Sequence, residues 1–157
     1  MQKDELIKYL QANFPVHKLE EGQYSTVLYT DKGELYSVAK QLKEGNETQF
    51  DFLSCETAVD KSTHFEVVYY LTSSKFRHSL ILKVILENRE APEIESIVSL
   101  WKAAELYECE IFDLFGIKFL NHPTLRRIFL GDDWRGFPLR KDYVQDDNDI
   151  IKAGINL

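Results

Sequence analysis

The chain has 157 residues and a mass of 18.4 kDa, which is the size of one ordinary domain with a sizeable core. Hydrophobic residues make up 44% of it and exclude a disordered chain, while the formal net charge of -7 argues against a nucleic-acid-binding protein, because affinity for phosphate backbones comes mainly from clustered lysine and arginine. The two cysteines are far apart in the sequence and in no CxxC arrangement, so their thiolates alone cannot hold an iron–sulfur cluster or a zinc ion.

The N-terminal part of the chain predicts two short helices with a strand between them. Residues 4–14 have apolar side chains at helical spacing, and Pro15 ends the pattern. Residues 24–29 are mainly β-branched and aromatic, which favours a strand. Residues 34–43 predict a second helix, and its inner face is expected to consist of Leu35, Val38, Ala39 and Leu42. Helices this short need a sheet to pack against.

Three further runs, 50–59, 65–72 and 79–86, are rich in strand-forming residues and predict that sheet. The polar connections at 60–64 and 73–78 are short, as in antiparallel hairpins. The expected fold class is therefore α+β: a two-layer domain with helices packed on a mostly antiparallel sheet. The most apolar run, 80–86, is too short to span a bilayer and contains Lys83, so any membrane association is expected to go through a partner.

Residues 93–115 place apolar side chains every three or four positions and predict the longest helix, with Gly116 as its end. Four acidic side chains crowd this segment: Glu105, Glu108, Glu110 and Asp113. At about 100° per residue only Glu105 and Glu108 share a face, so no acid/base pair is implied. A solvated face with a few partner contacts is the simpler interpretation.

The rest of the chain shows no arrangement typical of catalysis or cofactor binding. The four histidines are scattered at no spacing typical of a metal site, and the glycines are too dispersed for a phosphate-binding loop. Cys109 lies between two glutamates, whose charge makes a thiol a poor nucleophile. We therefore expect no catalytic residue, no cofactor-binding residue and no metal ligand in this chain. A free-standing enzyme that uses Glu105, Glu108 and His122 remains an alternative.

The last quarter of the chain differs from the rest in charge and pattern. Residues 1–117 contain 12 basic against 20 acidic residues, a net charge of -8, whereas residues 118–157 contain 7 against 6, a net charge of +1. Residues 118–157 lack helical and strand periodicity, yet their apolar residues alternate with arginines, and aromatic and arginine side chains are enriched at the centres of protein interfaces. We expect residues 1–117 to form the globular domain and residues 118–157 an extended tail that binds a partner protein. A tail that folds back on its own domain and an RNA-binding arm are the alternatives.

Two blocks of residues make the chain similar to a known family. The first runs from Glu108 to Ile117 (ECEIFDLFGI) and is followed by residues 122–128 (HPTLRRI); the second runs from Gly136 to Tyr143 (GFPLRKDY). In this order they resemble the 30 kDa-type subunit, also called the C-type subunit, of respiratory complex I, the proton-pumping NADH:quinone oxidoreductase. The chain departs from the family at Cys109, where the family usually has an arginine. This change removes one potential ion pair with a neighbouring subunit or within the helix.

The resemblance implies a structural and assembly subunit of the peripheral arm, beside the quinone-binding module of a complex that passes electrons from NADH to quinone at the cytoplasmic face of the cell membrane. The chain is expected to hold no cofactor itself, with flavin and iron–sulfur clusters in partner subunits. Its expected partners are homologues of the large D-type subunit and of the B-type subunit of the complex. The equivalent subunit of a related complex, such as a plastoquinone- or ferredoxin-linked dehydrogenase or a membrane-bound hydrogenase, shares these motifs and remains an alternative.

The residue pattern and the resemblance together predict the residues of the partner interface. These are Glu108, Glu110, Asp113, His122, Arg126, Arg127, Trp134, Phe137, Arg140 and Lys141. Arg126 and Arg127 in particular are expected to pair with carboxylates of the partner, because a guanidinium group binds a carboxylate through two parallel hydrogen bonds.

Overall fold

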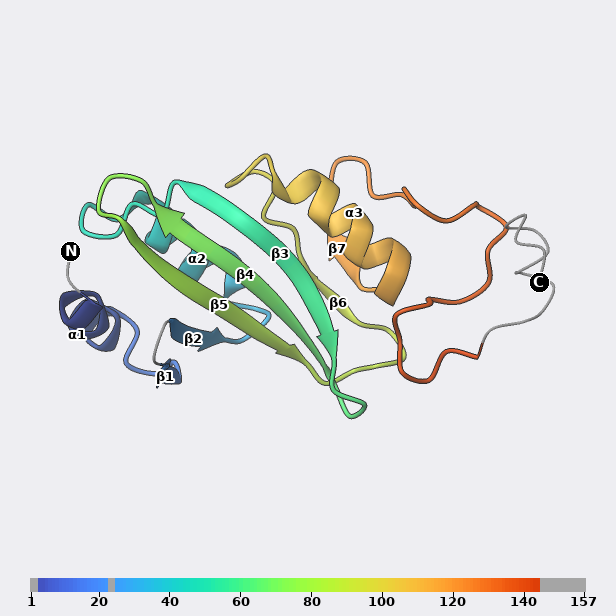
Figure 1. The fold of residues 1–157 in the computed structure, drawn as a ribbon, viewed down its shortest axis with the longest axis horizontal. Helices are drawn as coiled ribbons and strands as arrows, with labels where there is room; N and C mark the ends of the chain where they lie inside the picture. Colours follow the sequence, from blue (N-terminus) through green and yellow to red (C-terminus); the bar gives the residue numbers. More distant parts are fainter. Residues whose placement is uncertain (1–2, 23–24, 145–157) are drawn as a thin grey trace.

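The computed structural model describes residues 3–22 and 25–144. In these residues the chain forms, in order, α1 (Lys3–Asn13), β1 (Leu19–Glu21), β2 (Thr26–Thr30), α2 (Leu35–Glu44), β3 (Phe52–Asp60), β4 (Phe65–Ser73), β5 (His78–Leu86), β6 (Glu93–Glu95), α3 (Ala104–Phe115) and β7 (Lys118–Leu120) (Figure 1). The predicted strand start at Tyr24 and the part of the predicted tail beyond residue 144 lie outside the described residues.

Five of the strands form one sheet in the order β1-β2-β5-β4-β3. Two hairpins join β3, β4 and β5, as the short polar connections predicted. β2 pairs with β5 in parallel, and the crossover that this requires is supplied by α2 and the hairpin of β3 with β4. β4 lies inside the sheet, with a neighbouring strand at each edge. On one of its faces Phe65, Val67, Tyr69 and Leu71 are buried, whereas on the other face Val68 is buried and Tyr70 is 42% exposed.

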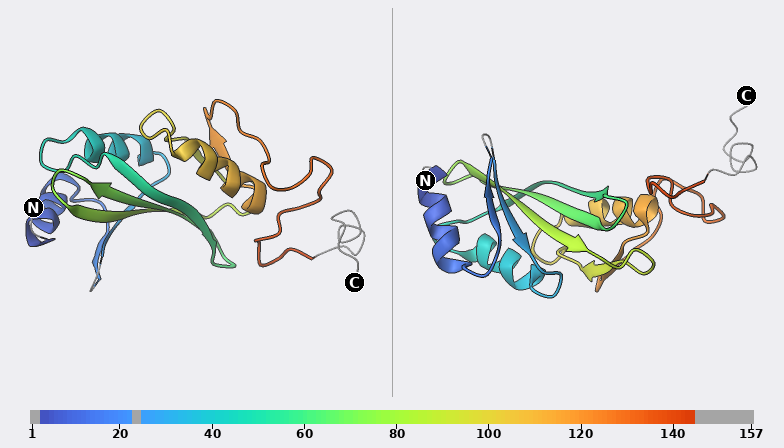
Figure 2. Two further views of the ribbon diagram at one scale, coloured as in Figure 1. Left: turned by 45° about the horizontal axis from the view of Figure 1, so that its top comes forward. Right: turned by 90° about the horizontal axis from the view of Figure 1, so that it is seen from below.

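Helices α2 and α3 lie over the same face of this sheet (Figure 2). The inner face predicted for α2 is confirmed, since its buried residues are Leu35, Val38, Ala39 and Leu42. Helix α1 adds Leu6, Leu10 and Phe14 to the same core, and burial of each such side chain contributes roughly 1.5–3 kcal/mol. The fold is α+β with helices packed on a mostly antiparallel sheet, as the sequence predicted.

The helix predicted over residues 93–115 is wrong in its first half. β6 instead pairs in parallel with β7, and residues between β6 and α3 form separate turns, one of them closed by the Trp101 N–H donating to the Ile97 carbonyl at 3.0 Å. Helix α3 begins only at Ala104. Ile94, Ile97 and Trp101 are still buried, because the strand and the turns keep these side chains facing the core. The apolar spacing therefore identified core positions, whereas the pairing of distant segments decided the backbone conformation.

The predicted tail begins with β7, which packs beside α3 and pairs with β6. Residues 121–144 then form an extended loop beyond the C-terminal end of α3, at the opposite end of the molecule from α1 (Figure 1). We call residues 125–143 the docking loop. The division of the chain at residue 117 into a domain and a tail remains a prediction.

Candidate partner-docking site

The docking loop is tied to α3 through the side chain of Asp113, which is fully buried near the end of that helix. Asp113 Oδ2 accepts three successive backbone N–H groups, from Ile128 at 3.0 Å, Phe129 at 2.7 Å and Leu130 at 3.0 Å. Asp113 Oδ1 accepts a hydrogen bond from Arg127 Nη1 at 2.9 Å. One carboxylate thus fixes four consecutive residues of the loop.

Two opposing effects set the pKa of Asp113. Burial raises it, but the three N–H donors and the Arg127 guanidinium group together outweigh burial, so the pKa lies below its ordinary value. Asp113 is therefore ionised at neutral pH, and hydrogen bonds to an ionised carboxylate are among the stronger ones in proteins.

The loop also pairs the last backbone carbonyl groups of α3. A helix leaves its final carbonyls without partners inside the helix. Here the Phe112 carbonyl accepts the N–H of Gly116 at 2.9 Å. The next three carbonyls accept hydrogen bonds from the loop: Asp113 from Arg127 Nη1 (3.2 Å), Leu114 from the Leu139 N–H (3.1 Å) and Phe115 from Arg140 Nε (2.6 Å). The two guanidinium groups also lie at the negative end of the helix dipole, which favours cations.

A second carboxylate, Asp60 at the end of β3, holds the far end of the loop. The Arg89 guanidinium group pairs with both of its oxygens, and the Lys141 N–H donates to Oδ2 at 2.9 Å. The hydrogen-bonded Arg89 is the largest cause that keeps the pKa of Asp60 well below its usual range. Arg89 also reaches Asp142 Oδ2 at 3.3 Å.

Between these two carboxylates lies a stack of rings and guanidinium groups. The Arg127 and Arg140 guanidinium carbons lie 5.2 and 4.8 Å from the centre of the Phe137 ring, and that of Arg140 also lies 5.1 Å from the Phe65 ring. The Phe137 ring covers the backbone of Gly116, where a methyl group would overlap it. Gly116 has a φ of 70°, the left-handed conformation that ends many helices and that glycine adopts most readily.

The outer side of the loop and of α3 leaves several large side chains exposed. Phe129 is 64% exposed and Leu139 is 52% exposed, although their neighbours in sequence are anchored to the domain. Leu106, on the outer face of α3, is 63% exposed. Arg126 and Arg135 are also exposed, and Arg126 contacts only its neighbour Thr124 among the hydrogen bonds of the described residues.

The predicted interface residues therefore fall into two groups. Those whose polar contacts lie within the chain are Glu108, Asp113, His122, Arg127 and Arg140, joined by Phe137. In the second group Arg126 and Lys141 are exposed and Glu110 and Trp134 are partly accessible, as Arg127, Phe137 and Arg140 of the first group also are. The indole N–H of Trp134 has no acceptor within the described part of the chain. Whether the second group meets a partner stays a prediction.

Glu105, Glu108 and His122, the residues of the enzyme alternative, do come together. His122 Nε2 donates to the Glu105 carbonyl at 3.0 Å and lies 3.9 Å from Glu108 Oε2. The side chains of His122 and Glu108 have no exposed surface, so a substrate cannot reach them in this conformation. Cys109 is also buried, with Sγ 3.9 Å from His122 Nε2. The side chain of Cys109, at the position where the family usually has arginine, therefore points into the interior of this chain.

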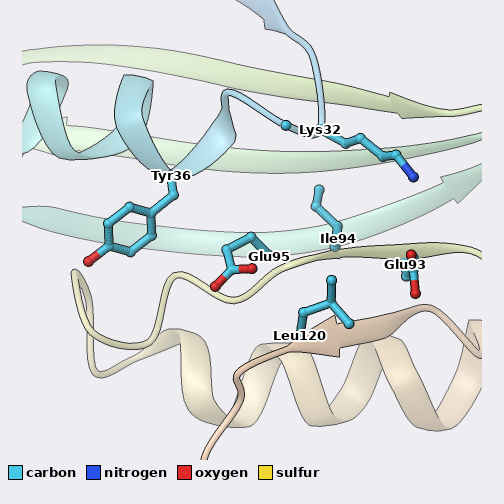
Figure 3. A pocket seen from close by; sticks show the side chains of 7 residues that line it. Lys32, Tyr36, Glu93, Ile94, Glu95 and Leu120 are labelled. Atoms are coloured by element: carbon cyan, nitrogen blue, oxygen red, sulfur yellow. The ribbon is translucent and has the colours of Figure 1, made fainter.

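A groove lies between the start of α2 and the β6–β7 pair (Figure 3). Lys32 and Tyr36 lie on one side of it, with Ile94, Glu95 and Leu120 on the other. Two of its polar side chains are paired within the chain: Tyr36 with Ser99 at 3.0 Å, and Glu95 with Asn121 at 2.8 Å. The Tyr36 hydroxyl and the Glu95 carboxylate therefore already have hydrogen-bond partners.

Within 3–22 and 25–144, no cluster of three or more histidine, cysteine, aspartate or glutamate side chains is placed to hold a metal ion. None of the helices in these ranges has the length and apolar character needed to cross a membrane.

Sequence reasoning missed the anchors on the domain side, Asp60, Arg89 and Phe65. Asp60 falls in the predicted connection at 60–64, where acidic residues are common, and the sequence separation of Asp60 and Arg89 from Lys141 hides the contact. The one available signal was the end of α3, because its unpaired carbonyls and its dipole attract arginines. That signal favours the alternative in which part of the tail folds back on its own domain.

Comparison with known proteins gives consistent relatives. Residues 28–149 match the family described as "Respiratory-chain NADH dehydrogenase, 30 Kd subunit". The chain is 40% identical over 142 residues to the C-type subunit of NADH-quinone oxidoreductase from Moorella thermoacetica, covering 89% of this chain and 94% of that protein. It is 42% identical over 138 residues to the C-type subunit from Roseiflexus castenholzii, covering 85% and 79%.

Other relatives are longer. The C/D-type subunit of NADH-quinone oxidoreductase from Phocaeicola vulgatus is 39% identical over 117 residues, which are 74% of this chain but 22% of that protein. The chain thus spans about a fifth of the length of this C/D protein. A solved structure of a membrane-bound sulfane sulfur reductase, an archaeal respiratory membrane complex, contains a chain with a TM-score of 0.79 and 22% identity, covering 97% of this chain and 91% of that one. At this identity the likeness shows the fold alone.

Proposed function

Because this chain belongs to the family of the 30 kDa subunit of respiratory-chain NADH dehydrogenase, we propose that it is a structural and assembly subunit in the quinone module of a proton-translocating NADH:quinone oxidoreductase. In this role it supports the transfer of electrons from NADH to quinone without holding the redox groups. Flavin and iron–sulfur clusters belong to its partner subunits. The complex places it in the peripheral arm, at the cytoplasmic face of the cell membrane.

The observation that supports this role best is the preformed docking loop. Asp113 and Asp60 hold its two ends, and its middle pairs the last carbonyls of α3. Phe129 and Leu139 remain exposed although the backbone beside them is fixed. A loop that is ordered before binding loses less conformational entropy on association, so its exposed side chains contribute more to affinity.

The proposed main partner is a homologue of the D-type subunit. The relatives of the C/D type unite the two subunits in one protein, which supports contact between them. A homologue of the B-type subunit is the second proposed neighbour. We assign the partner surface to Arg126, Phe129, Arg135 and Leu139, with Glu110, Trp134 and Lys141 beside them. Glu108, Asp113 and His122 shape this surface from inside the chain and do not face the partner.

Co-purification from one host tests the proposal. A tagged copy of the whole chain, expressed together with the D-type and B-type homologues of its own organism, is expected to elute with both in a fixed ratio. A chain that elutes as a single monodisperse monomer while the other two proteins associate contradicts it.

The same preparation separates the alternatives. A related complex is identified by the other subunits that co-purify with the tagged chain, because those that accept electrons from NADH differ between the complexes. A free-standing enzyme would instead turn over a substrate without partners and lose that activity in Glu108→Gln. The burial of Glu108 and His122 argues against this outcome.

A further inference from the structure

Two glutamate side chains are buried together between the sheet and α3. Glu56 lies on the inner face of β3 and is 2% exposed; Glu108 lies on the inward face of α3 and has no exposed surface. Both oxygens of Glu56 and Oε2 of Glu108 have no hydrogen-bond partner among the described residues. Glu108 Oε1 accepts the Ile97 N–H at 2.8 Å. None of these contacts belongs to the docking surface described above.

Among the described residues, the groups on β3, β4 and β6 that face the pair carry no positive charge. From β4, Tyr69 stands opposite Glu56 in the strand register, and its buried hydroxyl also lacks a partner within the described part of the chain. From β3, Cys55 adjoins the pair, and from β6 Glu95 adds a further negative charge. From the segment after β6, the Ser96 hydroxyl and the Ile97 N–H lie next to Glu108.

His122, which follows β7, is the one basic side chain that approaches Glu108 in the described contacts, at 3.9 Å. Its Nδ1 accepts the Thr124 N–H at 3.0 Å and therefore has no hydrogen of its own. Its Nε2 donates to the Glu105 carbonyl. Both nitrogens of the imidazole are thus engaged elsewhere, and neither donates a hydrogen bond to the Glu108 carboxyl group.

Two ionised carboxylates without a counterion are not stable in such a site, because burial and mutual repulsion both disfavour the charged form. Burial is the largest cause that raises the pKa of Glu108 to about 7. Burial, followed by the charge of Glu108, raises the pKa of Glu56 well above its ordinary value. Burial and the same two carboxylates raise the pKa of Tyr69.

We propose that Glu56 and Glu108 form a proton-holding pair that joins β3 to α3, in which at least one carboxyl group stays neutral at physiological pH. Loss of this proton leaves two like charges between the sheet and the helix that holds the docking loop. Alkaline pH therefore loosens α3 from the sheet. This inference concerns the chain itself and does not depend on which partner it binds.

The sign of the effect follows from proton binding. Below the ordinary pKa of a glutamate both the folded and the unfolded chain are protonated, so the contribution of the pair to stability is fully present. As the pH rises toward the raised pKa of the folded state, the unfolded chain releases the proton first, and the stability falls. For each such proton the equilibrium constant for unfolding increases about tenfold per pH unit.

The test is urea unfolding of the whole chain from about pH 5 to about pH 9. The variants are Glu56→Gln and Glu108→Gln, which replace the carboxyl by a neutral group of similar shape, with the exposed Glu93→Gln as a control. His78, whose pKa burial lowers, changes stability in the opposite direction over this range, but it does so equally in all four proteins. The comparison is therefore between each variant and the unchanged chain.

With rising pH, the equilibrium constant for unfolding should increase more steeply in the unchanged chain than in Glu56→Gln, by a further factor of about ten per pH unit. The variant should be the more stable of the two at the alkaline end. Glu93→Gln should follow the unchanged chain. Equal pH dependence in Glu56→Gln, Glu93→Gln and the unchanged chain overturns the proposal.

A second measurement covers the case in which a variant fails to fold. The unchanged chain is unfolded by heat in buffers of different ionisation enthalpy, and calorimetry counts the protons exchanged. The measurement is made at about pH 8, above the ordinary histidine pKa, because His78 takes up protons on unfolding at lower pH. Net release of protons from the chain on unfolding supports the proposal. Net uptake, or no exchange, contradicts it.

Discussion

Single side chains decide how the docking loop is held. Asp113 accepts three backbone N–H groups and one guanidinium group, and Asp60 receives Arg89 and the Lys141 N–H. In both cases the donors and the carboxylate are distant in sequence, so each contact closes a long stretch of chain. A loop fixed in this way presents its other side chains in a defined arrangement.

Asp113→Asn removes the charge and replaces one of the two acceptor oxygens by an NH2 donor, which then faces either the three N–H groups or Arg127. We expect it to lower the free energy of unfolding by about 1–3 kcal/mol and to release the docking loop. Limited proteolysis should then cleave residues 125–143 faster than in the unchanged chain. Asp132→Asn, at an exposed position of the same loop, is the control. Equal cleavage rates in Asp113→Asn and Asp132→Asn would show that Asp113 does not hold the loop.

Asp60 makes the stability of the folded chain depend on pH in the acidic range. The Arg89 guanidinium holds the pKa of Asp60 well below its usual range, so the stability that this pair contributes is present above the ordinary aspartate pKa and is lost as the pH falls toward the folded-state value. Asp60→Asn should be less stable than the unchanged chain at neutral pH and lose less stability on acidification. Urea unfolding at a series of pH values measures both. An acid loss as steep as in the unchanged chain counts against this assignment.

At the residue scale, the sequence predicted which side chains of the loop are important more reliably than it predicted their contacts. Arg127, Phe137 and Arg140 were predicted to meet a partner, and within the chain they contact the end of α3 and Phe65. Whether they also meet a partner stays a prediction. A segment that packs on its own domain and a segment that packs on a partner subunit have the same content of apolar and guanidinium side chains. The distinction depends on acceptors elsewhere in the fold, such as Asp60, whose position in space the sequence pattern does not contain.

Among the elements, the end of α3 is the most constrained. Gly116 adopts a left-handed conformation and lies under the Phe137 ring. Gly116→Ala should cost about 1–2 kcal/mol from the backbone conformation alone, and more from displacement of Phe137. Gly33→Ala is the matched control, because no atom lies within 4 Å of its added methyl group. Urea unfolding of both variants measures the difference; equal stability would mean that the loop readily moves away from Gly116.

The elements also show where sequence patterns suffice. The inner face of α2 and the three long strands follow from local periodicity, because each buries one continuous set of apolar side chains. The helix expected from residue 93 failed, since Glu93–Glu95 pair with Lys118–Leu120. A three-residue parallel pair depends on two distant segments meeting, and helical spacing of buried residues is compatible with it. Short strands of this kind are the least visible in a single sequence.

At the scale of the whole molecule, a two-layer α+β body anchors a loop at one end (Figure 1). The anchors keep the loop in place, and Phe129 and Leu139 are left for another protein. This arrangement combines the two interpretations of the tail: the inner side of the loop packs on its own domain, and the outer side is proposed to bind the D-type partner. The buried Glu56–Glu108 pair lies in the same body and links the position of α3 to pH.

The most direct test is the affinity of the whole chain for a homologue of the D-type subunit, measured by calorimetry. The double variant Phe129→Ala/Leu139→Ala should bind at least about tenfold more weakly than the unchanged chain, because exposed apolar side chains at an interface centre contribute strongly to affinity. Its urea midpoint should stay unchanged, since both side chains are largely exposed. Val16→Ala, equally apolar and 85% exposed but near the end of α1, should bind as the unchanged chain does. Unweakened binding by the double variant would contradict the assignment of this surface.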